Sequence, residues 1–130
     1  LESYFDECQP KIRELTKRGV EVVVINRYLT EAELDELVRG VDLIIVANSN
    51  NAPSGIVIKA LALGTVVVTA GKGIVRRLMR EAGRSSFVAE LSSQSIANVV
   101  NQVESFEKHP VPGLPVKSDF YRELVGSDGV

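Results

Sequence analysis

The chain has 130 residues, of which 45% are hydrophobic and 25% charged, and its formal net charge is −2. This length suits one domain with a single core, and the small net charge gives no general sign of nucleic-acid binding. The lone Cys8 excludes an internal disulfide and a cysteine zinc cluster, and no apolar run approaches the roughly 20 residues of a membrane span. The polar, acidic amino terminus is unlike a signal peptide, so we expect a cytoplasmic location.

The first elements follow from local patterns. Apolar residues at helical spacing predict a helix over residues 2–18, which Pro10 is expected to kink or interrupt. The chain opens on this helix without an initiator Met, so we expect it to be a piece of a longer protein. The β-branched run VEVVVI predicts a strand over 20–25, and Thr30 with Glu33 forms a capping-box pattern for a helix that ends at Gly40.

The most informative stretch covers residues 41–73. Two apolar runs, 42–47 and 65–69, flank one helical segment over 54–63. Neither run alternates polar with apolar residues, which is typical of strands buried on both faces of a parallel sheet. The connection is long enough for a helical crossover, so the stretch predicts a strand–helix–strand unit.

The remaining patterns complete the predicted fold. They indicate a helix over 73–81, a short strand over 86–89 and a helix from 92 to about 108. The proline-rich HPVPGLPV predicts an extended surface segment, and a short helix is expected over 117–124. We therefore predict an α/β, Rossmann-like, doubly wound domain over 1–108, whose mostly parallel sheet contains four strands and lacks its usual first strand. Residues 109–130 form the proline-rich segment and the final helix.

Open parallel sheets bind ligands beyond the carboxyl ends of their strands, where this chain carries two loops. The first, Asn48-Ser49-Asn50-Asn51, is either an ordinary loop whose side chains bond their own backbone or a polar rim for a sugar or nucleotide. Ser54-Gly55, at the expected helix start, is either a plain N-cap or a source of N–H groups for an anion.

The second loop, Gly71-Lys72-Gly73, is either a flexible turn or a phosphate contact, and it is too short for a P-loop. A basic run follows it, consisting of Lys72, Arg76, Arg77, Arg80 and Arg84. This run is either a solvated helix face or a contact for a phosphate or a partner domain. The lone His109 precedes a proline and is expected to be a surface residue.

The stretch from the predicted strand at 42–47 to residue 70 resembles part of a known family of domains. It consists of a strand, a polar loop, a helix and the run ALALGTVVVTA. The family is the C-terminal, donor-binding domain of retaining, group 1 glycosyltransferases of the GT-B fold. Members typically show a strand, then PSxxEGFGxxxxEAMAxGxPVVA, then a glycine-rich loop. The positions that fit this pattern are Ala60, Leu61, Ala62, Gly64, Thr65, Val67 and Val68. Gly71-Lys72-Gly73 stands where the family has its glycine loop, and the resemblance covers roughly residues 1–108.

The chain departs from the family at the Glu-x7-Glu motif. Lys59 stands at the second glutamate position and Asn51 at the first, or Ala52 if the loop is shifted by one residue. In the family the second glutamate typically holds the ribose hydroxyls and the first lies near the sugar. An ammonium only donates hydrogen bonds, so Lys59 cannot replace a carboxylate there, although it can meet a phosphate as a point charge.

The resemblance implies that the chain binds a nucleotide-diphosphate sugar, whose sugar passes to an acceptor held mainly by an N-terminal Rossmann-like domain of the same protein. The implied donor-binding residues are Ser49, Asn51, Ser54, Gly55, Lys59, Gly71, Lys72 and Gly73. No catalytic residue is assigned, and no metal, cofactor or nucleic acid is expected. The isolated chain is expected to be inactive, and peripheral membrane association of the full-length protein stays open.

Two alternatives remain at this point. The first is a degenerate glycosyltransferase-like domain that binds or scaffolds without catalysis, which Asn51 and Lys59 suggest. The second is an unrelated small α/β binding module. Titration with nucleotide sugars separates this unrelated module from the other two interpretations, and activity of the full-length protein separates the enzyme from the degenerate domain.

Overall fold

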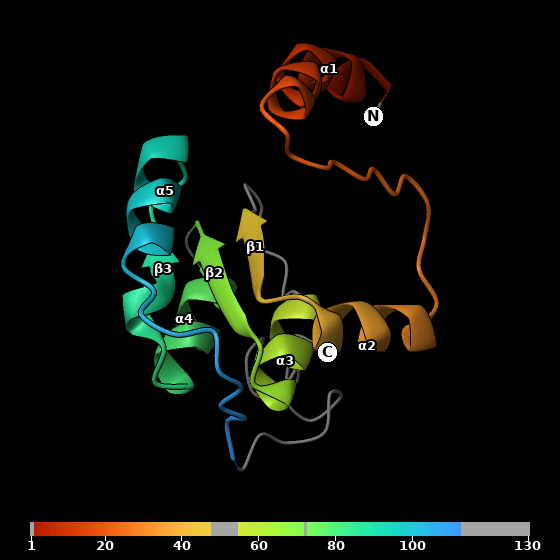
Figure 1. Ribbon diagram of the computed structural model, residues 1–130. Helices are drawn as coiled ribbons and strands as arrows, with labels where there is room; N and C mark the ends of the chain where they lie inside the picture. Colours follow the sequence, from red (N-terminus) through yellow and green to blue (C-terminus); the bar gives the residue numbers. More distant parts are fainter. Residues whose placement is uncertain (1, 48–54, 72, 113–130) are drawn as a thin grey trace.

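The computed structural model describes residues 2–47, 55–71 and 73–112, in which helices alternate with strands after residue 30 (Figure 1). The elements in chain order are α1 (Glu2–Lys17), α2 (Glu31–Gly40), β1 (Leu43–Ala47), α3 (Gly55–Leu63), β2 (Val66–Ala70), α4 (Ile74–Glu81), the 3₁₀ turn η1 (Ser85–Phe87), β3 (Val88–Ala89) and α5 (Ser93–Asn101). The chain is therefore an α/β protein with a Rossmann-like arrangement, as the sequence predicts. The helix expected over 117–124 lies outside the described residues.

The sheet has the order β1-β2-β3, and both strand pairs are parallel. Ile44 lies opposite Val67, and Ala47 lies opposite Ala70. β3 pairs with β2 through two residues only, because the 3₁₀ turn η1 occupies the first part of the predicted strand. The predicted parallel sheet is confirmed for three of the expected strands.

The core lies on the face of the sheet that α2, α3 and α4 cover. Its buried members are Val38, Val57, Ile58, Ala60, Leu61, Val67, Val75, Leu78 and Met79. The small Ala60 is fully buried, which lets α3 approach β2 closely. α5 packs against β2 and β3 without contributing to this cluster, so helices lie on both faces of the sheet. The strands follow one another in sequence order, so the reversal of strand order that defines a doubly wound sheet is not seen among the described residues.

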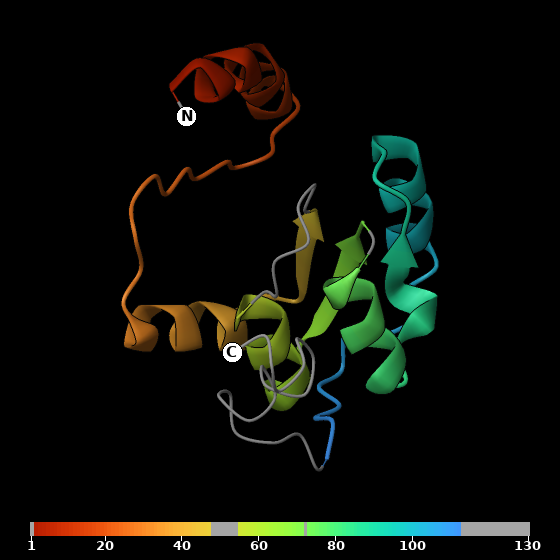
Figure 2. The ribbon, with the colours of Figure 1, turned by 180° about the vertical axis from the view of Figure 1, so that it is seen from behind.

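The strand expected over 20–25 does not form, and this prediction is wrong. These residues run as an extended link between α1 and α2, apart from the sheet (Figures 1 and 2). Their β-branched side chains favour an extended backbone, but a strand also needs a partner for its N–H and C=O groups. Val23 is 72% exposed, so the segment has neither strand partner nor core contact.

Contacts at the start of α2 hold the chain in this direction. Thr30 and Glu33 form the predicted capping box, with a Glu33 N to Thr30 Oγ1 distance of 3.1 Å. The Arg27 guanidinium donates two hydrogen bonds to the Glu33 carboxylate, from Nη1 to Oε1 at 3.1 Å and from Nη2 to Oε2 at 2.6 Å. Residues 27–30 are thereby tied to the first turn of α2, and the segment before them leads away from the sheet.

Two further predictions about helices need correction. α1 is continuous from Glu2 to Lys17, so Pro10 does not interrupt it, because one missing N–H leaves the other hydrogen bonds of a long helix in place. A kink at Pro10 stays a prediction. α5 ends at Asn101 rather than near Lys108, and residues 103–112, here called the strap, run across the amino ends of the strands without regular structure. The expected course without a helix is thus confirmed for residues 109–111, and Pro112 lies in a turn.

Tertiary hydrogen bonds explain why α5 stops early. The Lys108 ammonium donates to Val41 O at 3.2 Å and to the buried Thr65 Oγ1 at 2.8 Å. His109 N then donates to Gly64 O at 3.0 Å, and Val111 N donates to Leu61 O at 3.0 Å. A helix that continued to Lys108 would carry these donors away from α3 and β2, so the contacts of the strap outweigh the local helical pattern.

Candidate functional site

The carboxyl ends of the three parallel strands meet at one edge of the sheet, here called the carboxyl edge. Ala47, Ala70 and Ala89 mark these ends. α4 begins there, directly after the end of β2, and it has no acidic residue in its first turn, whereas α2 has Glu31 and Glu33. The positive end of the α4 dipole therefore lies at this edge without a carboxylate on its own first turn.

The loop between β2 and α4 needs glycine at two positions. Gly71 has φ 124°, and Gly73 has φ 83° with ψ −134°, which are conformations that other residues rarely adopt. Gly71 N donates to Ala89 O at 3.4 Å and so joins the loop to β3. Gly73 begins α4 without a side-chain cap. The predicted Gly71 and Gly73 thus lie at the carboxyl edge, whereas the predicted Gly55 is the first residue of α3.

Other predicted residues at this edge cannot be placed. Ser49, Asn51, Ser54 and Lys72 lie outside the described residues. Their roles in donor binding stay predictions.

The Thr69 side chain is a signal that sequence reasoning missed. Thr69 is the penultimate residue of β2 and only 1% exposed, and its Oγ1 has no hydrogen-bond partner among the described residues. Leaving a buried hydroxyl unpaired costs about 1–3 kcal/mol. Threonine is so common in strands that its sequence position gave no indication of this. A polar group that reached Thr69 from the carboxyl edge would recover that cost.

The structure gives Lys59 a role that the resemblance did not suggest. Its ammonium donates to Glu31 Oε2 at 2.9 Å and to Asp35 Oδ1, and its side chain is 18% exposed. The hydrogen bond to Asp35 is the largest cause that raises the pKa of Lys59, and the hydrogen bond to Glu31 is the second. The Lys59–Asp35 hydrogen bond also lowers the pKa of Asp35. Lys59 thus joins α3 to α2, and its charge already has two carboxylate partners. The sequence around Lys59 gave no signal of these partners, which lie 28 and 24 residues before it.

The basic run does not form a single positive surface. Arg76 lies at the carboxyl edge, where its Nε donates to Gly71 O at 3.3 Å and its Nη2 lies 3.4 Å from Glu90 Oε1. Arg77 pairs with Glu81 on its own helix. Arg84 lies at the other end of α4, where it donates to His109 O at 3.2 Å. Of these three, only Arg76 is available to a ligand at the carboxyl edge.

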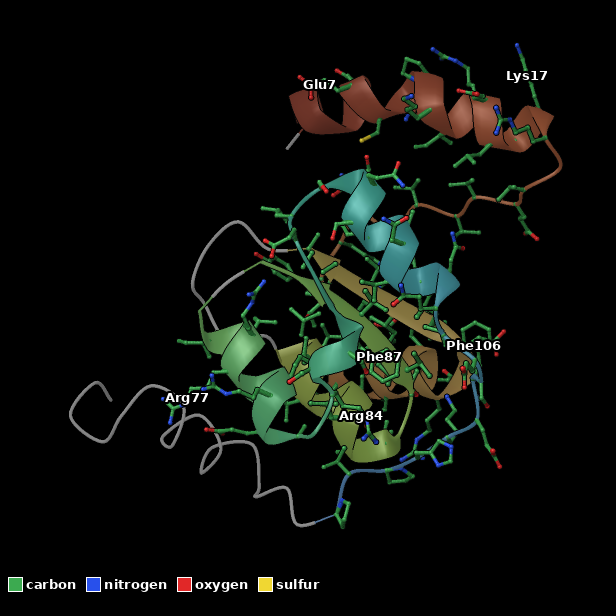
Figure 3. All side chains as sticks on the ribbon, turned by 90° about the vertical axis from the view of Figure 1, so that its left-hand side faces the viewer. Glu7, Lys17, Arg77, Arg84, Phe87 and Phe106 are labelled. Atoms are coloured by element: carbon green, nitrogen blue, oxygen red, sulfur yellow. The ribbon has the colours of Figure 1, made fainter. Side chains whose placement is uncertain are left out.

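The main hollows among the described residues lie elsewhere. One of about 380 Å³ opens at the amino end of β2, where Arg84 and Phe87 line it together with Gly64 (Figure 3). Another of about 410 Å³ lies beside α2 and is lined by Arg27 and Leu37. His109 lines the first hollow from the strap and is exposed, as expected.

The described residues contain no group of three or more His, Cys, Asp or Glu side chains that could hold a metal ion. Within the same residues, no helix is long and apolar enough to cross a membrane. Comparison of the chain with protein-family models, with curated proteins and with solved structures found no match. The class of the protein is therefore defined by its fold, an α/β arrangement with an all-parallel sheet.

Proposed function

We propose that the carboxyl edge binds a nucleotide-diphosphate sugar and that the chain is the donor-binding half of a glycosyltransferase. The observation that carries the proposal is the buried Thr69 hydroxyl, which has no partner among the described residues and lies beside the glycine loop. A diphosphate oxygen accepts hydrogen bonds from a hydroxyl and from backbone N–H groups at a helix start. Gly71 and Gly73 carry no side chains, so an anion can approach the backbone of this loop closely.

Charge supports the same ligand. The start of α4 presents a positive dipole end, and Arg76 adds a guanidinium at the same edge. Guanidinium groups bind phosphates through paired hydrogen bonds, so Arg76 can exchange its long contact with Glu90 for a ligand oxygen. In this proposal the chain holds only the donor. A second, N-terminal Rossmann-like domain of the full-length protein holds the acceptor, so sugar transfer needs both.

A second candidate function is a domain that binds or scaffolds without catalysis. Lys59 favours it, because the position at which the resembled family holds the ribose carries an ammonium bound to Asp35 and Glu31. The nucleotide would then be held by its phosphates alone, and binding would depend little on the base. Sugar transfer by the full-length protein separates the two functions, since only the first predicts it.

Titration calorimetry of the chain with UDP-glucose, GDP-mannose and, as a ligand without a diphosphate, uridine tests the proposal. We expect binding of at least one nucleotide sugar and none of uridine. Thr69→Val removes the hydroxyl at nearly constant volume and should weaken binding about tenfold without loss of stability, because an unpaired hydroxyl is removed.

Gly73→Ala provides the second arm, and Gly83→Ala is its matched control. Both glycines have positive φ, at 83° and 74°, but Gly83 lies at the far end of α4. The added Cβ strains the backbone more at Gly73, where ψ is −134°, so affinity is compared for folded protein of each variant. Only Gly73→Ala should reduce nucleotide-sugar affinity, by about tenfold or more. Equal losses in both variants, or no binding of either sugar by the wild type, would overturn the proposal.

A further inference from the structure

β1 is an edge strand, and its outer side has no strand partner among the described residues. β2 is the only strand that pairs with β1 among the described residues, so the other backbone edge of β1 is free. Ile45 is 50% exposed, whereas Val68, its register partner on β2, is 0% exposed. α5 covers the sheet at β2 and β3. Both the outer edge of β1 and its face at Ile45 therefore lack a cover.

Residues 20–25 of the chain have the composition of a strand that could pair with the outer edge of β1. Residues 20–25 are already extended, and Val20, Val23, Val24 and Ile25 are 46%, 72%, 48% and 49% exposed. Apolar side chains therefore occur on both faces of the segment, which is the pattern of a parallel strand that is buried on both sides. An exposed β-branched strand and an open sheet edge are each templates for pairing with another chain.

The preceding helix has no extensive packing partner among the described residues. α1 stands apart from the sheet and its helices in Figures 1 and 2, and Figure 3 labels Glu7 and Lys17 on it. Its apolar residue Leu15 is 41% exposed, and no body element packs extensively against it. A helix that precedes an added strand can cover the sheet face opposite α2, which is the face that carries Ile45.

We propose that two copies of this chain exchange residues 20–25, so that each segment adds as a parallel strand to the free edge of β1 in the other copy, with α1 covering Ile45. The reason for exchange is the junction at 27–30. The capping box and the Arg27–Glu33 ion pair direct the segment away from the β1 of its own copy. Exchange between identical copies is reciprocal, so one contact repeated twice closes the dimer and pairs the free edge of β1 in both copies.

Sedimentation equilibrium and hydrogen exchange of the full 130-residue chain test this inference, over protein concentrations from about 1 µM to 200 µM. We expect a monomer–dimer equilibrium in which the backbone amides of residues 20–25 become protected as the dimer forms. Protection that depends on concentration distinguishes exchange between copies from docking within one copy, which gives the same protection at all concentrations.

Val23→Lys is the decisive variant, and Tyr28→Lys is its control. Val23 is 72% exposed in the single chain, so a lysine there leaves the fold intact, but it would be buried against the partner sheet in the exchanged dimer. We expect the dimer dissociation constant to rise about a hundredfold. Tyr28 is 100% exposed and lies outside the segment, so its replacement should change the constant less than about threefold.

Three results would overturn the inference. They are a chain that stays monomeric over the whole range, a dimer whose residues 20–25 exchange as fast as in the monomer, and a dimer that Val23→Lys leaves as tight as the wild type. None of these measurements involves a nucleotide sugar, so the outcome is independent of the proposed function.

Discussion

β2 and the segment at residues 20–25 are both rich in β-branched residues, but β2 is a buried strand and the segment is an exposed link. β2 is VVVTA, with Val67, Val68 and Thr69 buried at the centre of the sheet. The segment is VEVVVI, and Val23 is 72% exposed. Both backbones are extended or nearly so, as β-branched residues favour. The difference lies in their partners, because β2 has strands on both sides and helices above and below, and the segment has none.

The comparison separates two contributions to strand formation. Local composition selects the extended backbone, which both regions adopt. Burial and the hydrogen-bond ladder come from the neighbours, and only β2 has them. β1 stands between these extremes, since Ile44 packs on the core and Ile45, on the other face, is half exposed. Ile44 itself is only half-buried, because β1 is an edge strand.

The largest expected effect tests the comparison directly. Val67→Ala should lower the free energy of unfolding by about 2–4 kcal/mol, through lost transfer energy and a cavity beneath α3. Val23→Ala should change it by less than about 0.5 kcal/mol, because no packing is lost. Urea unfolding measured at a concentration at which the chain is monomeric gives both values. Equal effects of the two variants would mean that residues 20–25 are packed after all.

A smaller effect is expected at Gly64, which tests how strongly the strap depends on its neighbour. Gly64 has φ 83°, and a Cβ there would collide with the backbone of His109 and Pro110. Gly64→Ala should therefore cost about 1–2 kcal/mol of backbone strain and, in addition, displace the strap. Gly83→Ala has φ 74° and open space, so it should cost the strain alone. Faster hydrogen exchange of the His109 and Val111 amides in Gly64→Ala, and not in Gly83→Ala, would confirm the difference.

The smallest expected effect concerns the junction that directs residues 20–25 away from the sheet. The hydrogen bond from Arg27, followed by the backbone N–H of Thr30, lowers the pKa of Glu33 from 4.5 to about 2. A lowered folded-state pKa adds stability above the ordinary pKa, and this contribution disappears as the pH falls through the folded value. Wild type should thus be more stable than Glu33→Gln above pH 4.5, and the difference should vanish toward pH 2.

Thermal unfolding between pH 7 and pH 2 measures this difference, and Glu36→Gln on the same helix is the control. Glutamine can still accept the capping hydrogen bond, so the variant removes the charge of Glu33 and keeps the cap. A difference between wild type and Glu33→Gln that does not change with pH would show that the ion pair with Arg27 contributes nothing.

The parts of the fold that depend on neighbouring residues in the sequence were predictable. The Thr30 capping box and the helix stop at Gly64 are local signals, and the structure contains both. The alternation of apolar strands with helices likewise gave the parallel sheet, because that pattern reflects burial on two faces. At the candidate site, Gly71 and Gly73 have positive φ, so the turn that the sequence indicates there is present, and its part in ligand binding stays a prediction.

The parts that depend on distant residues were not predictable from one sequence. The end of α5 is decided by Lys108, whose partners Val41 and Thr65 lie far away in the chain. The contacts of Lys59 with Glu31 and Asp35 join two helices that only the fold brings together. Resemblance to a family suggested a ligand role for Lys59, because it aligned Lys59 with a ligand-binding position of the family motif. Such an alignment contains no information on the carboxylates that contact Lys59 in the fold.

The strap also has a mechanical consequence. The backbone hydrogen bonds from His109 to Gly64 and from Val111 to Leu61 join the chain after α5 to the turn between α3 and β2. A pulling force applied beyond Val111 therefore acts first on these two bonds and on the Lys108 contacts. These hydrogen bonds break before the hydrogen bonds between β2 and its neighbouring strands are loaded. The strap therefore reduces the force that reaches the centre of the sheet.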